Sequence, residues 1–157
     1  MKVTTLCLIH EHSKVLLGMK KRGFGMGLWN GFGGKVKSDE TIEEAAKREV
    51  LEECGIEALA MTEQGVLVFE FQNGEESIEM HIYRIDRHRG DPIETEEMRP
   101  QWFDSDKIPF KDMWSDDPYW FPLFLQGKRF KGRIRFDQAS GPAHSAVIIE
   151  QDIREVE

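Results

Sequence analysis

The sequence has little cysteine, no long apolar run and no excess of basic residues. Its two cysteines, Cys7 and Cys54, are too few for a disulfide framework, and their spacing does not fit a zinc site. The N-terminal residues lack the apolar core and cleavage site of a signal peptide, and no run is long enough to span a membrane. We therefore expect a soluble protein of the cytoplasm, with the nucleus and the mitochondrion as further compartments.

The chain is acidic, with 21 Lys and Arg residues against 29 Asp and Glu residues and a formal net charge of -8. Long nucleic acid needs a basic face, so it is not an expected partner. A small anionic molecule could still bind if a cation lay between it and the protein. No internal repeat or low-complexity linker divides the 157 residues, so we expect a single domain over 1–157, acting as a monomer.

Apolar patterning predicts strands and two helices. The first helix begins after Thr41, which forms a T-x-x-E capping box with Glu44, and ends at Gly55, a left-handed cap. The second covers 116–125, with Asp117 as N-cap and Pro118 at the first position. The predicted strands are 3–9, 15–19, 65–71, 78–85, 99–103, 130–136 and 146–149. This mixture indicates one α/β layered domain.

Three glutamates, Glu49, Glu52 and Glu53, lie near the end of the first helix. A helical glutamate usually faces water, opposite the apolar stripe. At about 100° per residue, however, Glu49 and Glu53 continue the line that Ile42 and Ala46 begin, which predicts inward carboxylates. Such carboxylates repel one another and resist burial, and a hard cation such as Mg²⁺ would remove that cost. The helix alone leaves both a metal site and a solvated face open.

The residues that precede the helix decide between these alternatives. From Gly34 the chain reads GKVKSDETIEEAAKREVLEECGI, which is G-x5-E-x7-R-E-U-x-E-E-x-G-U, where U is bulky and apolar. Every fixed position matches the Nudix box, so the chain resembles the Nudix hydrolase family. The resemblance implies the Nudix fold, a mixed β-sheet sandwiched between α-helices, and cleavage of a nucleoside diphosphate linked to another group.

The same resemblance implies roles for individual residues. Mg²⁺ would be the cofactor, with Mn²⁺ as a substitute, and Arg48 would hold one carboxylate in place. The implied metal ligands are the Gly33 carbonyl, Glu49, Glu52, Glu53 and Glu97. The implied catalytic residues are Glu53, Glu49, Glu52, Arg48 and Glu97, and one of these glutamates would activate water.

Outside the box, the runs LLGMKKRGFGMGLWNGFGGKV, EEMRPQWF and IPFKDMWSDDPYWFPL resemble the animal branch of the family that hydrolyses oxidised purine nucleoside triphosphates. This branch resemblance implies substrates such as 8-oxo-dGTP and 2-oxo-dATP, cleaved to monophosphate and pyrophosphate. The implied substrate-binding residues are Thr5, Lys20, Phe24, Asn30, Phe32, Gly33, Gly34, Lys35, Phe69, Met98, Trp114, Asp116 and Asp117.

Asp116 and Asp117 also carry a physical argument, because aromatic residues surround them in the sequence. Two neighbouring carboxyl groups in such surroundings should not both ionise, so one would donate and the other accept. Exchange of the proton would suit a guanine-like or an adenine-like edge, and the amide of Asn30 can do both. Trp114 offers a stacking plane. The alternatives are that Asp117 only caps the helix and that Trp114 only packs in the core.

Two other functions stay open from the sequence. The chain could be a Nudix hydrolase for methylated purine nucleotides or another nucleoside diphosphate derivative, or a silent module that only binds nucleotide or protein. Among the weaker signals, the basic run 128–136 is interpreted as a charge-protected edge strand rather than a nucleic-acid arm. His10 and His12 are interpreted as surface residues. His81, His88 and His144 lack the spacing of metal ligands.

Overall fold

The computed structural model describes residues 1–138 and 146–157, so His144 and most of 137–145, which the sequence predicts as a loop between the strands at 130–136 and 146–149, lie outside the described residues. The strands are β1 (Lys2–Glu11), β2 (Lys14–Lys20), β3 (Trp29–Asn30), β4 (Glu57–Phe71), β5 (Ile78–Arg89), β6 (Met98–Asp104), β7 (Arg129–Phe136) and β8 (Ile148–Val156). The helices are α1 (Ile42–Cys54), the short 3-10 turn η1 (Phe110–Asp112) and α2 (Asp117–Leu125).

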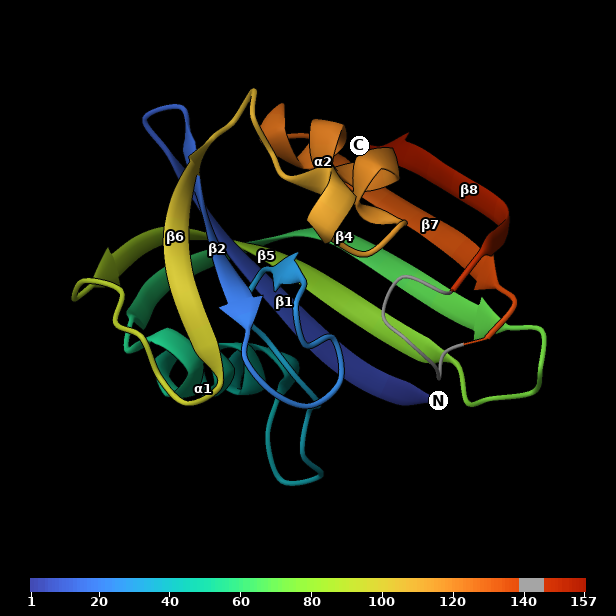
Figure 1. Cartoon of the computed structure of the whole chain (residues 1–157), viewed down its shortest axis with the longest axis horizontal. Coiled ribbons are helices and arrows are strands. Elements are labelled where there is room, and N and C mark those ends of the chain that lie inside the picture. Colours follow the sequence, from blue (N-terminus) through green and yellow to red (C-terminus); the bar gives the residue numbers. More distant parts are fainter. Residues whose placement is uncertain (139–145) are drawn as a thin grey trace.

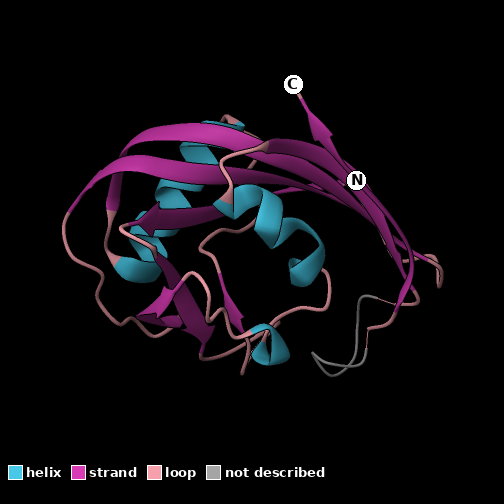
Figure 2. Cartoon of the chain, turned by 90° about the horizontal axis from the view of Figure 1, so that it is seen from above, coloured by secondary structure: helices cyan, strands magenta, loops and turns pink. Residues whose placement is uncertain are grey.

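The strands form one mixed sheet in the order β3-β2-β1-β5-β4-β7-β8, with β6 paired to β2 (Figure 1). β1 joins the two halves of this sheet: its first part runs parallel to β5, and its last residues run antiparallel to β2. β4 pairs antiparallel with β5 and parallel with β7. Figure 2 shows the long strands as a curved layer.

Each helix packs over a different core, and the side chains of β1 alternate between the two. Leu6 and Leu8 belong to the core that contains the α2 aromatics, whereas Cys7 and Ile9 belong to the core that contains Val50 of α1. Successive side chains of a strand point to opposite faces of the sheet. The helices therefore cover opposite faces, and the prediction of a mixed sheet between helices is confirmed.

The predicted ends of α1 are also confirmed. The amide of Glu44 donates to Thr41 Oγ1 at 3.1 Å, and the amide of Thr41 donates to Glu44 Oε1 at 3.4 Å, which completes the capping box. Gly55 has φ 76° and closes the helix by donating its amide to the Leu51 carbonyl at 3.0 Å. These local contacts fix where the glutamates of the last turn lie.

The predicted cap of α2 is wrong. Asp117 is the first residue of the helix rather than its N-cap, and Pro118 is therefore the second residue. Asp116 occupies the N-cap position, and its side chain makes no capping hydrogen bond. The helix is only nine residues long and contains Pro122, which has no amide hydrogen to donate within the helix. Both aspartates are thus free of a capping role.

The interpretation of the basic run as an edge strand is wrong as well. β7 lies inside the sheet, between β4 and β8. Its charged residues Arg129, Lys131, Arg133 and Arg135 alternate with buried or half-buried residues and are exposed on one face of the sheet. The edge belongs to β8, which begins at Ile148, two residues later than predicted, and continues to Val156. β4 also begins earlier than predicted, at Glu57.

Candidate active site

Glu53 lies in the last turn of α1 with its side chain only 7% exposed. Its Oε1 accepts a hydrogen bond from the Gly33 amide at 2.8 Å, and its Oε2 lies 3.9 Å from Nζ of Lys20. Burial raises the pKa of this carboxyl to about 7, although the Gly33 amide and Lys20 oppose that shift. The predicted inward direction of Glu53 is confirmed, and its charge is costly without a cation.

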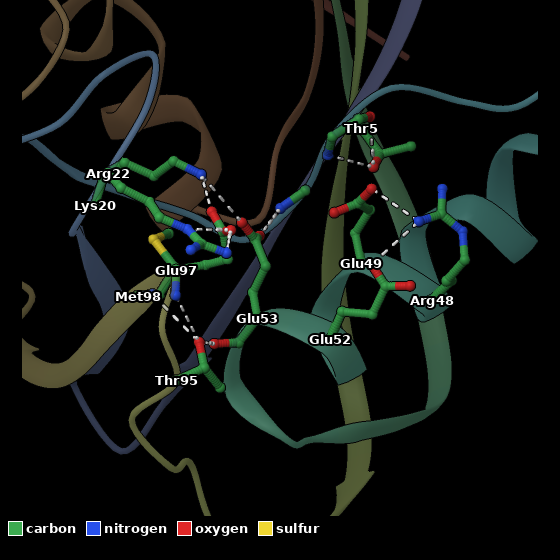
Figure 3. Close-up of polar contacts among 12 residues, drawn as sticks. Thr5, Lys20, Arg22, Arg48, Glu49, Glu52, Glu53, Thr95, Glu97 and Met98 are labelled. Atoms are coloured by element: carbon green, nitrogen blue, oxygen red, sulfur yellow. Dashed lines mark hydrogen bonds and ion pairs between the residues drawn. The ribbon is translucent and has the colours of Figure 1, made fainter.

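Arg48 contacts the other two glutamates of α1 that are implied metal ligands, Glu49 and Glu52 (Figure 3). Its Nη1 donates to Glu49 Oε1 at 2.9 Å and to Glu52 Oε2 at 3.3 Å. Its Nε and Nη2 donate to the two oxygens of Glu40 at 3.0 and 2.7 Å. Glu49 is 18% exposed and Glu52 is 57% exposed, so the three acids range from buried to open. The expectation that Arg48 holds a carboxylate in place fits these contacts.

Glu97 comes to the same place from the connection before β6. Its Oε2 accepts from Nζ of Lys20 at 3.0 Å, and its Oε1 accepts from Nε of Arg22 at 2.7 Å. The Lys20 ammonium therefore lies between the carboxylates of Glu53 and Glu97 (Figure 3). Hydrogen bonds from Arg22 and Lys20 lower the pKa of Glu97. Arg22 was not predicted, because nothing in the sequence distinguishes it from its basic neighbours.

Two glycines let the loop before α1 approach this site closely. A Cβ on Gly33 would lie 1.9 Å from the carbonyl oxygen of Thr5, and one on Gly34 would lie 2.7 Å from the carboxyl carbon of Glu49. The Thr5 amide donates to the Gly34 carbonyl at 2.9 Å, which holds the loop on β1. Only glycine fits these two positions without displacing β1 or Glu49.

A cavity of about 280 Å³ opens beside the acidic site. Predicted substrate-binding residues that line it are Thr5, Lys20, Phe24, Asn30, Gly33, Gly34, Phe69, Met98, Trp114, Asp116 and Asp117. Apolar residues that were not predicted also line it, among them Phe71, Ile78, Met80 and Phe136. These residues come from β4, β5 and β7. The alternation of apolar and polar residues in these strands predicts a face that packs in the core, but it does not predict that a cavity lies against that face. Glu53 also lines the cavity, which joins the acids to the apolar pocket.

Two predicted substrate residues do not line this cavity. Phe32 is fully buried and packs in the core under α1. Lys35 is exposed, and its carbonyl accepts a hydrogen bond from Nη2 of Arg48 at 3.2 Å. Both residues lie on the loop that carries Gly33 and Gly34, so the structure places them beside the site rather than in the pocket.

Phe24 and Trp114 form the mouth of the cavity. Their ring centroids are 5.0 Å apart with an interplanar angle of 32°, and the Phe24 side chain is 66% exposed. Trp114 lines the cavity and is not one of the fully buried core aromatics, so core packing alone does not account for its position. A flat ring that entered here would meet aromatic surfaces on one side.

The two aspartates lie at the far wall of the cavity and are both buried. Asp116 Oδ2 accepts a hydrogen bond from Nε1 of Trp120 at 3.0 Å. Burial raises the pKa of both carboxyl groups, and the negative charge of Asp116 raises that of Asp117 further. Within the described part of the chain, Asp117 Oδ2 is buried and has no hydrogen-bond partner. Burial therefore opposes the ionisation of both carboxyl groups, and it does so more strongly at Asp117.

The acidic site suits a hydrated divalent cation rather than a closed metal cage. No three His, Cys, Asp or Glu side chains among the described residues are arranged so that they could hold a metal ion alone. Mg²⁺ keeps several waters and shares its shell with substrate phosphates, so it needs only one or two protein carboxylates. The Lys20 ammonium between Glu53 and Glu97 shows that this pair of acids already attracts a cation.

A mixed sheet between two helices, with the carboxylates of a capped helix beside a partly apolar cavity, defines a hydrolase of the Nudix class. The chain belongs to the Nudix family, because the model of the NUDIX domain matches residues 1–124. Members of this family generally use a divalent metal ion. No helix in the described part of the chain has the length and apolar character needed to cross a bilayer.

Known proteins resemble almost the whole chain. The oxidized purine nucleoside triphosphate hydrolase of Danio rerio is 53% identical over 99% of this chain and 96% of that protein. The mouse protein of the same name is 49% identical with the same coverage. The crystal structure of a MutT protein from Bacillus halodurans superposes with a TM-score of 0.83 at 24% identity, over 98% of this chain and 97% of that chain. The last similarity supports the fold alone.

Proposed function

We propose that the protein hydrolyses oxidised purine nucleoside triphosphates to the monophosphate and pyrophosphate with Mg²⁺ as cofactor. The observation that carries this proposal is Asp117 Oδ2, a buried polar atom at the wall of the cavity that has no hydrogen-bond partner among the residues that the structure describes. An unpaired buried polar group costs stability, so its position has value only when a ligand completes it. The relatives from Danio rerio and Mus musculus, whose names state this activity, support the same substrate class.

The polar groups of the cavity match the edge of a purine base. Asp117 donates its proton, Asp116 accepts, and the amide of Asn30 can do both. Oxidation of a purine changes which edge atoms carry hydrogen. A pair of carboxyl groups that shares one proton can match either arrangement by moving that proton from one residue to the other. Phe24 and Trp114 then hold the plane of the base at the mouth of the cavity.

The acidic end of α1 would meet the triphosphate of such a substrate. Glu49, Glu52, Glu53 and Glu97, with the Gly33 carbonyl, would supply the ligands for hydrated Mg²⁺, with one or two carboxylates on each ion. The bound metal would neutralise phosphate charge and lower the pKa of a coordinated water. Lys20 is ready to turn from Glu97 to a phosphate oxygen, because one ammonium contacts both Glu53 and Glu97. Arg48 would keep Glu49 oriented throughout.

One assay separates this function from its alternatives. Pyrophosphate release is measured from 8-oxo-dGTP, 2-oxo-dATP, O6-methyl-dGTP and dGTP, with and without Mg²⁺. We expect Mg²⁺-dependent turnover that strongly favours the oxidised purines. Equal turnover of dGTP, or a preference for the methylated purine, would overturn the proposed substrate class. No turnover of any nucleotide would leave only the silent binding module.

We also propose the cytoplasm as the compartment and a monomer as the active form. Cys7 and Cys54 are free, buried thiols, which suits a reducing compartment. Subcellular fractionation and the mass measured by light scattering test the two statements separately.

A further inference from the structure

Thr95 lies in the connection between β5 and β6 and contacts both ends of the acidic site (Figure 3). Its Oγ1 donates to the carbonyl of Glu53 at 2.8 Å. The same oxygen accepts from the amides of Glu97 and Met98, each at 3.2 Å. One hydroxyl therefore joins the last turn of α1 to Glu97, an implied metal ligand, and to Met98, a wall of the cavity.

The Glu53 carbonyl needs such a partner because it belongs to the end of a helix. The last carbonyls of an α-helix have no amide partner within the helix. The Cys54 carbonyl next to it accepts from the Ile93 amide at 2.9 Å, so the β5–β6 connection satisfies two successive carbonyls of α1. The contact between Ile93 and Cys54 is made by backbone atoms and survives any substitution of Ile93 other than proline. The contact with the Glu53 carbonyl depends on the side chain of residue 95.

The turn that contains Thr95 does not depend on its hydroxyl alone. The Thr95 amide donates to the Met98 carbonyl at 3.0 Å, and the Lys21 amide donates to the Glu97 carbonyl at 2.9 Å. These backbone contacts hold 95–98 against β2 without any side chain. Loss of the hydroxyl thus removes the contact of residue 95 with the Glu53 carbonyl, and it leaves both the backbone bond from Ile93 to Cys54 and the local turn.

We propose that Thr95 is a positioning residue, which fixes the backbone of Glu53 relative to that of Glu97. This constraint sets the separation of the two carboxylates that would hold the metal. This inference rests on the proposed function, because it assigns Glu53 and Glu97 to one metal ion. It adds that the hydroxyl passes the same constraint to the Met98 amide. One oxygen atom, Thr95 Oγ1, then contacts the backbone of both implied metal ligands and of Met98, which lines the cavity.

The test compares variants that differ only in the hydroxyl. Thr95→Val keeps the branched shape and removes the oxygen, whereas Thr95→Ser keeps the oxygen and removes the methyl group. Thr62→Val is the matched control, because Thr62 Oγ1 also donates one hydrogen bond, to Asp86 Oδ2 at 2.5 Å, on an exposed part of β4. Mn²⁺ binding is followed by electron paramagnetic resonance without nucleotide. kcat and KM for 8-oxo-dGTP are measured at saturating Mg²⁺, well below each melting temperature.

We expect Thr95→Val to raise the Mn²⁺ Kd about tenfold or more and to lower kcat, as loss of an outer hydrogen-bond partner does at metal sites. Thr95→Ser and Thr62→Val are expected to stay within about threefold of the parent. If Thr95→Val changes only the melting temperature, or if Thr95→Ser is as weak as Thr95→Val, the inference is wrong. Should Thr95→Val not fold, Thr95→Ala against Thr95→Ser gives the same comparison of hydroxyl with none.

The parent chain separates the two levels of failure. A parent that binds no Mn²⁺ and hydrolyses no nucleotide overturns the proposed function and this inference with it. A parent that hydrolyses 8-oxo-dGTP normally, beside a Thr95→Val variant with unchanged metal affinity, overturns the inference alone.

Discussion

Arg48 and Glu40 form a two-point contact in which Nε and Nη2 of the guanidinium each donate to a different oxygen of the carboxylate, at 3.0 and 2.7 Å. Hydrogen bonds from Arg48 lower the pKa of Glu40 to about 2, so this carboxyl stays ionised as an anchor. The remaining nitrogen, Nη1, is thereby turned toward Glu49. Arg48 thus connects Glu40, in the loop before α1, to Glu49, an implied metal ligand.

The first prediction concerns this contact. Arg48→Lys keeps the positive charge but cannot reproduce the planar two-point contact with Glu40. We expect kcat/KM for 8-oxo-dGTP to fall by about 10- to 100-fold, the usual cost of losing a partner that orients a metal ligand. Lys47→Arg on the same helix serves as the control, since Lys47 pairs with Glu43, at 3.7 Å, and not with an implied metal ligand. Full activity of Arg48→Lys would show that charge alone is sufficient.

The second prediction concerns Glu53. Glu53→Gln keeps the size of the side chain and removes the ionised oxygen, so we expect turnover to be abolished while the fold stays intact. The melting temperature of the metal-free variant should equal or exceed that of the parent near pH 8, because burial raises the pKa of Glu53 to about 7 and makes its charge costly. Steady-state kinetics and circular dichroism check both statements. An active variant would contradict the metal assignment.

The third prediction concerns base selection by Asp116. Asp116→Asn alters the hydrogen-bonding character of the cavity wall but leaves the acids of α1 unchanged. We expect the ratio of kcat/KM for 8-oxo-dGTP to that for dGTP to fall at least tenfold, with the Mn²⁺ Kd unchanged within about twofold. The oxygen of the amide can still accept from Trp120, so the fold should persist. A variant that only melts at a lower temperature would assign Asp116 to structure.

The fourth prediction is a pH dependence that comes from Asp117. Burial raises the folded pKa of Asp117 well above its ordinary value, so the folded protein binds more protons than the unfolded chain between those two values. The free energy of unfolding should therefore fall as the pH rises from about 4 through that window. Asp117→Asn removes this proton exchange and should flatten the profile. Urea denaturation of the two proteins at several pH values measures the difference.

The fifth prediction concerns the aromatic mouth of the cavity. Phe24 is largely exposed although its ring contacts that of Trp114, so its removal should cost little stability. Phe24→Ala is expected to raise KM for 8-oxo-dGTP roughly two- to tenfold, the equivalent of one aromatic contact, with kcat nearly unchanged. Met26→Ala, which removes another exposed apolar side chain of the same loop, is the control. Equal effects of the two substitutions would indicate loop packing instead of stacking.

Features that depend on neighbours in the sequence could be predicted from it. The ends of α1 follow from the capping box at Thr41 and the left-handed Gly55, and the inward direction of Glu53 follows from helical spacing. The predictions that were wrong concern features that depend on distant parts of the chain. Asp117 is buried rather than a cap because the helix that it begins packs on the sheet. β7 is an interior strand because β8 pairs with it, and the sequence showed only the first residues of β8.

The residues that the sequence missed at the site have no pattern of their own. Arg22 is one of several adjacent basic residues, and Thr95 lies among three glutamates, Glu94, Glu96 and Glu97. Their importance appears only when β2 and the β5–β6 connection come together around Glu97. His81 is a similar case: its ring lies 3.2 Å from Glu63 and 2.8 Å from Glu79, so it is a buried partner of two carboxylates rather than an unremarkable histidine.

The position of β1 has a consequence for how the chain folds. Ribosomes make β1 first, yet its main partner is β5, where Lys2 pairs with Ile78 and Leu8 with Arg84. Neither core can close around β1 until that much later segment has emerged, because residues of β1 belong to both cores. Pairing across so long a loop slows folding. During synthesis, the apolar residues of β1 therefore stay exposed to solvent until β5 has been made. Exposed apolar surface promotes aggregation, so we expect a chaperone to be most useful at this stage.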